Sequence, residues 1–220
     1  MFSYHWRWAM AVKSFTTFAK KTNNINKSFF SILIVSAVAA MLLAACGKNH
    51  PHVLLQTELG DITVELYADK APVTVSNFLR YVGEGRFRDA TFYRVVTLEN
   101  QPDNDVKIEV VQGGLFDDDH PQALPPIPHE TTRSTGIRHL NGTISMARYG
   151  PGTASSEFFI CIGDQPSLDY GGKRNPDGEG FAAFGRVVKG MDVVRKIQHQ
   201  PAKGQYLEKK IKITAIKLLR

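Results

Sequence analysis

The sequence of 220 residues predicts a mainly β domain that follows a separate N-terminal segment. Three observations support this fold class. Short apolar stretches alternate with polar residues at the period of two that marks half-buried strands, turn residues separate these stretches, and only two segments have helical spacing. Many short strands with few helices are typical of a closed antiparallel barrel, although this pattern alone does not distinguish a barrel from a sandwich.

The strand predictions begin directly after the N-terminal segment. We expect strands at 53–57 and 62–67, where the second alternates between apolar and polar residues. Gly60-Asp61 between them has residue types that favour a hairpin turn. By the same criteria, further strands are expected at residues 90–96, 107–112, 142–148, 158–162, 182–188 and 209–219.

Two helices are expected, at 71–83 and 191–198. Pro72 suits the first turn of the earlier helix, where its missing N–H has no intrahelical partner to lose. The later helix ends before Pro201, which cannot continue it. Apolar residues three to four apart predict that one face of each helix packs on the β structure: Val75, Phe78, Leu79 and Val82 in one, and Met191, Val194 and Ile197 in the other.

The N-terminal segment has the organisation of a secretory signal. Its charged residues are all basic, an uncharged apolar run follows from Phe29 to Ala45, and small residues precede Cys46. The ending Leu43-Ala44-Ala45-Cys46 resembles a bacterial lipobox, in which the cysteine is lipidated and becomes the mature N-terminus. We therefore predict a signal peptide at 1–45, a lipidated N-terminus with a short tether at 46–52, and a globular domain at 53–220.

An uncleaved membrane anchor is the alternative, because the apolar run approaches the roughly 17 residues that a spanning helix needs. An anchor does not require a cysteine at position 46, so the lipoprotein interpretation is favoured. Both interpretations place the C-terminal domain outside the cytoplasm, since positive charge stays inside. Gly47 rather than aspartate after the cysteine fits sorting to the outer membrane, with the domain facing the periplasm. Met10 is an alternative start.

The net charge gives no indication of nucleic-acid binding. Five of the 27 basic residues and none of the 21 acidic residues precede Cys46. Without that segment, 22 basic and 21 acidic residues remain, a formal charge of +1. The basic character therefore belongs to targeting. If Cys46 is lipidated, Cys161 is the only remaining thiol, so that no disulfide is expected.

Three motifs occur in a characteristic order. They are Phe92-Tyr93-Arg94-Val95-Val96, with an arginine inside an apolar strand, then Val110-Val111-Gln112-Gly113-Gly114, and finally the segment 141–162 with Met146-Ala147, Gly150-Pro151 and Phe158-Phe159. This combination resembles the cyclophilins, the peptidyl-prolyl cis-trans isomerases, over nearly all of residues 52–220. The resemblance implies a closed eight-stranded antiparallel barrel capped by two short helices, which isomerises X–Pro bonds.

The resemblance also implies the site residues. Arg94 corresponds to the catalytic arginine, Gln112 to the glutamine that orients it, and Phe159 to the floor of the proline pocket. The implied substrate-binding residues are Tyr93, Val110, Ala147, Arg148, Glu157, Leu168 and Phe181. No cofactor and no metal are implied. The expected partners are proline-containing polypeptides and, through Cys46, a membrane; nucleic acid is not expected, and the chain is expected to be a monomer.

The sequence departs from this family at several positions. Tyr93 replaces a histidine and Glu157 a glutamine, and an insertion separates Arg94 from Gln112. Ungapped counting back from Gln112 places Glu109 where the family has a pocket phenylalanine. These departures motivate a second hypothesis, a proline-binding or chaperone module with little turnover. A hydrolase that uses Ser155 or Ser156 is disfavoured, because no Gly-x-Ser-x-Gly elbow is present.

Overall fold

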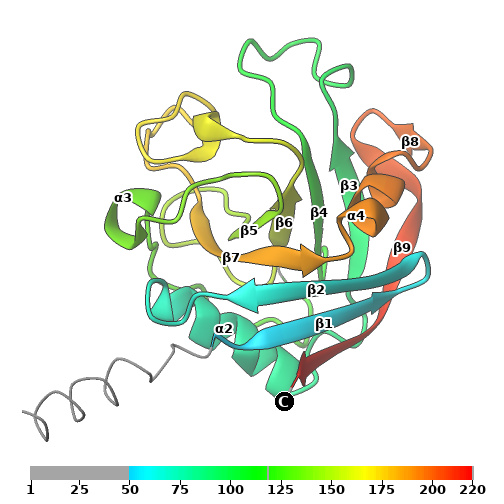
Figure 1. Cartoon of the computed structure of the whole chain (residues 1–220). Coiled ribbons are helices and arrows are strands. Elements are labelled where there is room, and N and C mark those ends of the chain that lie inside the picture. The colour runs from blue at the N-terminus through cyan, green and yellow to red at the C-terminus, as the bar shows by residue number, and fades with distance from the viewer. Residues whose placement is uncertain (1–49, 118, 220) are drawn as a thin grey trace, which may run out of the picture. The chain divides into compact units, whose positions relative to one another are not determined.

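The computed structural model describes residues 50–117 and 119–219 (Figure 1). The predictions for residues 1–49, including the signal peptide and Cys46, lie outside the described residues. Within the described ranges, none of the helices combines the length and the apolar character needed to cross a membrane. His52 was assigned to the tether, whereas the structure includes it in the first strand.

The described residues form nine strands, three helices and one 3₁₀ turn. The strands are β1 (His52–Thr57), β2 (Gly60–Leu66), β3 (Thr91–Val96), β4 (Val110–Gly114), β5 (Thr143–Met146), β6 (Phe158–Cys161), β7 (Ala182–Lys189), β8 (Ala202–Lys203) and β9 (Tyr206–Leu219). The helices are α2 (Pro72–Gly83), the single turn α3 (Thr132–Thr135), the 3₁₀ turn η1 (Pro166–Leu168) and α4 (Met191–Gln198).

Eight of these strands close into an antiparallel barrel, as predicted. Their order around the barrel is β1-β2-β7-β5-β6-β4-β3-β9, and β9 pairs again with β1. The short strand β8 pairs with β9 outside this ring. Figure 1 shows β1 and β2 crossing in front of the upright strands β3 and β4. Because the ring is closed, the eight strands leave no long unpaired edge.

Several element boundaries differ from the predictions. The first hairpin turns at Glu58-Leu59 rather than at Gly60-Asp61, since Thr57 pairs with Gly60 and β2 already begins there. Strand β4 begins at Val110, three residues later than predicted, and β9 begins at Tyr206, three residues earlier. The short elements α3, η1 and β8 were not predicted, because two to four residues carry no periodic signal.

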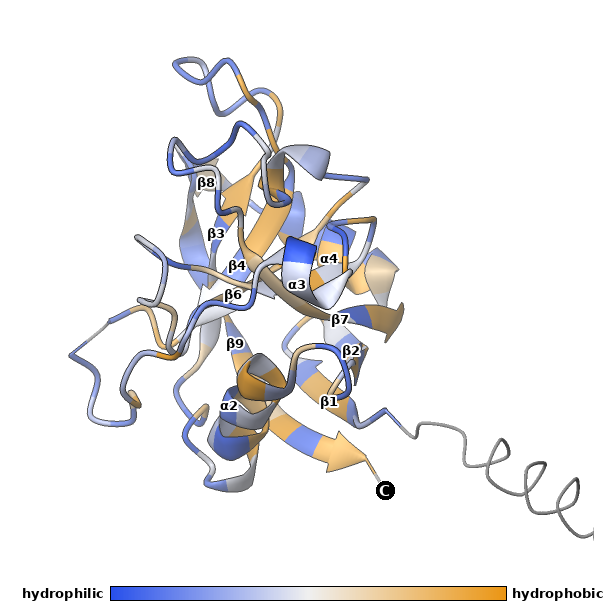
Figure 2. Cartoon of the chain, turned by 90° about the vertical axis from the view of Figure 1, so that its left-hand side faces the viewer, coloured by the Kyte–Doolittle hydropathy of each residue, from blue (hydrophilic) through white to orange (hydrophobic). Residues whose placement is uncertain are grey.

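One large apolar core fills the barrel and receives both longer helices. It includes Phe78 of α2 and Val194 of α4, together with inward-facing residues of the strands. The Phe158 ring of β6 packs edge-to-face on Phe78 and Phe92, with ring centroids 5.6 Å and 5.9 Å apart. Figure 2 shows the resulting alternation as orange and blue bands along β1 and the last strand.

A second, smaller apolar cluster lies on the opposite face of the same strands. It consists of Val96, Ile108, Val110, Phe159, Cys161 and Leu168, with Ala147 and Phe181 packed against it. Phe158 and Phe159 are neighbours in sequence, but they belong to the inner core and the outer cluster respectively. This is the period-two geometry of a strand, and it places an apolar floor on the outside of the barrel.

Replacing Phe158 by alanine is expected to destabilise the fragment 50–220 by about 3–5 kcal/mol, because the truncation opens a cavity among three aromatic rings. Urea denaturation followed by circular dichroism measures this change. Leu140→Ala at an exposed position serves as the control and is expected to change stability by less than about 0.5 kcal/mol. Equal effects of both substitutions would contradict the assigned core.

Candidate active site

A cavity of about 360 Å³ opens above the outer apolar cluster. It is large enough for a small ligand or a few residues of a peptide. All ten residues that the sequence predicted for the site line this cavity: Tyr93, Arg94, Val110, Gln112, Ala147, Arg148, Glu157, Phe159, Leu168 and Phe181. They come from five different strands and loops, so that the barrel topology, rather than sequence proximity, brings them together.

A single cross-strand row organises the centre of the cavity. Tyr206 of β9 is directly opposite Arg94 of β3, Arg94 is opposite Gln112 of β4, and Gln112 is opposite Phe159 of β6. Residues directly opposite each other in antiparallel strands point to the same face of the sheet. The register therefore places the arginine between a glutamine and a tyrosine, two strands away from the phenylalanine floor.

The Arg94 guanidinium is half-buried and held by two neutral amides. Its Nη1 donates to Gln112 Oε1 at 2.7 Å, and its Nε donates to Gln205 Oε1 at 3.0 Å. Nη2 also donates to the same Gln205 oxygen. A guanidinium has five N–H groups, so that two of them have no partner among the described residues. Arg94 is thus fixed in place while part of its hydrogen-bonding capacity faces the cavity.

Gln112 is itself oriented by a short relay. Its Nε2 donates to the Tyr93 hydroxyl at 2.6 Å, and that hydroxyl donates to Glu157 Oε2 at 2.5 Å. Because the amide nitrogen is committed to Tyr93, the amide oxygen must face Arg94. Tyr93 and Glu157, two of the departures from the family pattern, are therefore partners in one hydrogen-bonded chain.

The ionisation of these groups follows from their surroundings. Burial, and then the neighbouring Glu157 carboxylate, raise the pKa of Tyr93 far above its ordinary value, so that the hydroxyl remains a donor. Burial lowers the pKa of Arg94, but a guanidinium stays protonated in proteins. Arg94 thus keeps its positive charge beside a neutral phenol.

The apolar side of the cavity differs from the sequence prediction at one position. Glu109 was placed in the pocket by ungapped counting, but Ile108 lines the cavity instead. Ile108 is held there by Gln101, a buried residue of the inserted loop whose side chain binds both backbone groups of Ile108, at 3.3 Å to the N–H and 2.8 Å to the C=O. Glu109 contacts Gln198 at 3.4 Å. The pocket is therefore apolar at this position.

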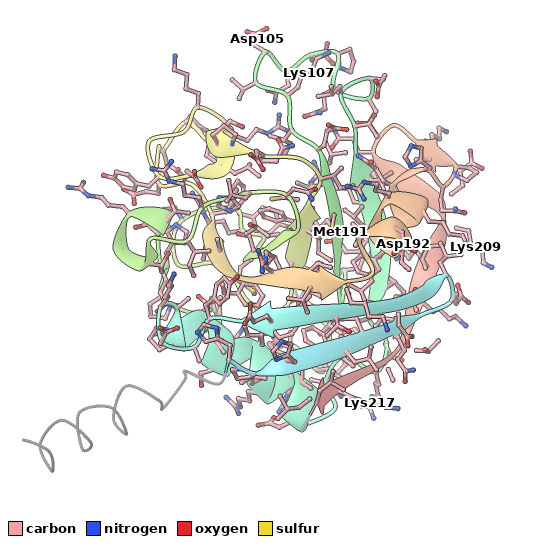
Figure 3. The ribbon with its side chains drawn as sticks, in the orientation of Figure 1. Asp105, Lys107, Met191, Asp192, Lys209 and Lys217 are labelled. Carbon is pink, nitrogen blue, oxygen red and sulfur yellow. The ribbon has the colours of Figure 1, made fainter. Side chains whose placement is uncertain are left out.

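The inserted loop between β3 and β4 contributes Ile108 to the wall of the cavity. It extends beyond the ends of both strands, and Figure 3 labels its exposed residues Asp105 and Lys107. Arg174, from the loop 169–180, donates to the Val106 carbonyl at 2.6 Å. This bond ties two long loops together beside the cavity.

The opposite wall is braced by Arg148. Its guanidinium forms two bonds with the Asp177 carboxylate, at 2.8 Å and 3.0 Å, and its Nε donates to the Gly180 carbonyl at 2.8 Å. The hydrogen bonds from Arg148 lower the pKa of Asp177 to about 2. Phe181 lies under this guanidinium and meets Phe159 edge-to-face at 5.3 Å. Arg148 therefore stabilises the floor through Phe181.

Eight further residues line the cavity that the sequence did not assign to it: Ile108, Phe116, Tyr149, Thr153, Ser155, Ser156, Gln205 and Tyr206. Gln205 is 111 positions from Arg94 in the chain, and a glutamine in a turn carries no signal of this task. Tyr206 follows from the register of β9 with β3, which single-sequence patterns do not provide. Phe116 lies two residues after the Gly113-Gly114 pair, but no sequence pattern assigned it to the site.

The two serines considered for hydrolysis have structural partners. Ser155 Oγ donates to the Leu124 carbonyl at 2.6 Å, and Ser156 Oγ donates to Glu157 at 2.9 Å. A different Ser–His–Asp arrangement does lie behind the floor, where His139 contacts Asp169 at 2.7 Å and Ser145 at 3.0 Å.

Both His139 and Ser145 of that arrangement are fully buried. The His139 ring instead stacks on Phe159, with ring centroids 6.0 Å apart. This arrangement therefore supports the floor of the cavity and presents no nucleophile to a substrate.

Comparison with known proteins agrees with this geometry. The family model for cyclophilin type peptidyl-prolyl cis-trans isomerases matches residues 52–218. The chain is 38% identical over 168 residues to peptidyl-prolyl cis-trans isomerase A of Dickeya dadantii, covering 76% of this chain and 81% of the relative. It is 36% identical over 147 residues to peptidyl-prolyl cis-trans isomerase B of Escherichia coli, covering 66% and 83%.

Solved structures show the same fold. A cyclophilin type isomerase of Cryptosporidium parvum superposes with a TM-score of 0.60 at 20% identity, covering 78% of this chain and 98% of the other. The same protein in the presence of the dipeptide Ala-Pro gives a TM-score of 0.61 at 21% identity, covering 77% and 99%. The barrel, its register and the extent of the sequence match together show that this chain belongs to the family of cyclophilin-type peptidyl-prolyl cis-trans isomerases.

Proposed function

We propose that this chain isomerises X–Pro peptide bonds in exported polypeptides, with Arg94 as the group that stabilises the twisted amide. The observation that carries this assignment is the Arg94 guanidinium itself, held by two neutral amides at the edge of an apolar floor. Isomerisation requires neither a nucleophile nor a metal, because no covalent bond is broken. It requires only that rotation about one bond becomes easier.

Rotation about an X–Pro bond is slow because it interrupts amide resonance. The rotation barrier is about 18–20 kcal/mol, and uncatalysed X–Pro exchange takes tens to hundreds of seconds. In the twisted state the amide loses charge separation, so that an apolar cavity favours it relative to water. The imide nitrogen also gains a localised lone pair, to which a fixed N–H donor can bind. Such a bond forms mainly in the transition state and therefore lowers the barrier.

Arg94 fits this demand because its charge is not neutralised locally. Its described side-chain partners are the amide oxygens of Gln112 and Gln205, not carboxylates. A charge-assisted hydrogen bond contributes about 1.5–3 kcal/mol, which corresponds to about one to two powers of ten in rate. The apolar floor around Phe159 would supply a further part by holding the proline ring away from water.

The hypothesis of a binding module with little turnover rested on Glu109 and Glu157, and the positions of both carboxylates argue against it. Glu109 does not line the cavity. Glu157 accepts hydrogen bonds from the Tyr93 hydroxyl, the Ser156 hydroxyl and the Phe116 N–H. Its charge is therefore engaged by these donors, and two residues of the relay separate it from Arg94. Neither carboxylate forms an ion pair with the guanidinium.

We further propose that the domain acts at a membrane in the periplasm, tethered through a lipid on Cys46, with the outer membrane as the expected location. The basic and apolar N-terminal segment and the Leu-Ala-Ala-Cys ending support this proposal. In this setting the substrates are exported proteins whose folding waits for X–Pro exchange.

Arg94→Lys is expected to reduce kcat/KM about 10- to 100-fold on a proline-containing tetrapeptide, and Arg94→Ala to abolish most of the activity. Lysine keeps the charge, but it does not reproduce the planar fork that contacts both glutamines. Exchange spectroscopy by NMR on fragment 50–220 measures the rate directly. Arg88→Lys, at an exposed position, is the matched control. Unchanged exchange in Arg94→Ala would remove Arg94 from the mechanism.

Tyr93→Phe is expected to lower kcat by about two- to tenfold while leaving the fold intact, because Gln112 loses the hydroxyl that orients its amide. Glu157→Gln and the double variant complete a mutant cycle. If the relay acts as one unit, the effect of the double variant will be smaller than the sum of the two single effects. Strictly additive effects would show that the residues act independently.

Cys46→Ala is expected to abolish incorporation of radioactive palmitate, because this thiol carries the lipid. Cys161→Ala is the control, since Cys161 is fully buried in the apolar cluster under the cavity. Persistent labelling of the Cys46→Ala protein would refute the lipoprotein assignment without affecting the assignment of the site.

A further inference from the structure

Phe116 has an unusual backbone conformation at the rim of the cavity. Its φ angle is 73°, and it is the only non-glycine residue with positive φ among residues 50–117 and 119–219. This left-handed region is disfavoured for bulky side chains. Residues in such conformations concentrate at functional sites, where surrounding contacts hold them. The conformation of Phe116 therefore calls for a functional explanation.

The contacts of Phe116 show how this conformation is maintained. Its N–H donates to Glu157 Oε1 at 3.0 Å. The Tyr93 ring packs edge-to-face on the Phe116 ring, with centroids 4.8 Å apart, and Lys210 Nζ lies 3.4 Å from its ring centroid. The same Glu157 carboxylate occupies the space that a Cβ at Gly114 would need. The backbone of Phe116 is thus held by Glu157, and its ring by Tyr93 and Lys210.

Despite these contacts, the ring remains largely open to solvent. Phe116 is 48% exposed, although a well-held aromatic ring would ordinarily lie in the core. Tyr206, with its ring centroid 6.5 Å from that of Phe116, is 55% exposed. Both residues line the same cavity as Arg94 and Phe159. Two partly open aromatic rings therefore stand at one end of the site.

The strand order defines where this end lies. The cavity crosses the sheet from β5 through β6, β4 and β3 to β9. Phe159 lies on β6, Arg94 on β3, and Tyr206 is directly opposite Arg94 on β9. Neighbouring strands are about 4.8 Å apart. A substrate chain with its proline on Phe159 and its imide nitrogen at Arg94, if it continues along the cavity toward β9, therefore reaches Tyr206 within about one or two residues, at about 3.3 Å per residue.

We propose that Phe116 and Tyr206 form an aromatic subsite that binds an aromatic side chain of the substrate polypeptide, one or two residues from the proline on the β9 side. This inference rests on the proposed function, because it places the proline on Phe159. Aromatic side chains pack edge-to-face or offset on such rings. The subsite would make this enzyme select proline sites that have an aromatic neighbour on that side.

The test uses the full-length chain in detergent and a set of five-residue peptides. Each peptide contains one proline, with tyrosine or alanine at each of the two positions before it and the two after it. Exchange spectroscopy gives kcat/KM for each peptide. At positions on one side of the proline only, tyrosine is expected to raise kcat/KM about two- to tenfold over alanine.

The same ratio of tyrosine to alanine peptides is then measured in variants. Phe116→Gly removes the ring, and because glycine adopts positive φ without strain, the substitution introduces no backbone strain at this position. Tyr206→Ala is the second variant. Both are expected to bring the ratio close to one. Tyr149→Ala is the matched control, because Tyr149 lines the cavity, is 88% exposed and belongs to the segment after β5; it is expected to leave the ratio unchanged.

Two results would overturn the subsite. One is the absence of a tyrosine preference at every position, and the other is a preference that survives in both Phe116→Gly and Tyr206→Ala. If the wild-type chain isomerises none of the peptides, the proposed function fails. The subsite is then judged by the dissociation constants of the same peptides from NMR titration, where the same ratio and the same variants apply.

Discussion

The site depends on a positive charge that is held rigidly without being neutralised. Burying a guanidinium is unfavourable unless its N–H groups find acceptors, and an ion pair would satisfy them most directly. Here the acceptors of Arg94 are the amide oxygens of Gln112 and Gln205. Neutral dipoles fix the group but leave its net charge available to a substrate. A carboxylate in either place would hold the arginine equally well and would cancel the field that the reaction needs.

The barrel can support this arrangement because the strands beneath the cavity have two faces, one packed in the core and the other exposed to the cavity. Phe158 belongs to the inner core that stabilises the closed barrel, and Phe159 to the outer cluster that forms the floor. The inner residues of these strands pack on one another in the core. The backbone that carries the cross-strand row of Tyr206, Arg94, Gln112 and Phe159 is therefore held in place by that packing. The position of the guanidinium relative to the floor is thus fixed by strand register rather than by flexible loops.

Periodicity along the sequence predicted the strands and both longer helices, while the resemblance to the cyclophilins, which rests on the order of the motifs, implied the closed barrel and the ten residues that line the cavity. Both missed contacts and pairings that neither periodicity nor the order of the motifs encodes. Gln205 holds Arg94 from a turn near the C-terminus. Gln101 of the inserted loop binds both backbone groups of Ile108, which lines the cavity in place of Glu109. The first hairpin shifted by two residues because cross-strand pairing, and not the residue types of the turn, sets its position.

The departures from the family pattern at Tyr93 and Glu157 form one coupled change, because the two side chains bind each other. Glu157 receives three donors, from Tyr93, Ser156 and Phe116, and a carboxylate is the side chain that accepts all of them without offering a donor of its own. A glutamine there would direct its NH₂ group at one of these donors. If it faced the Tyr93 hydroxyl, it would compete with Gln112 for the same oxygen. The tyrosine and the glutamate therefore require each other, and together they keep the glutamine oxygen on the arginine.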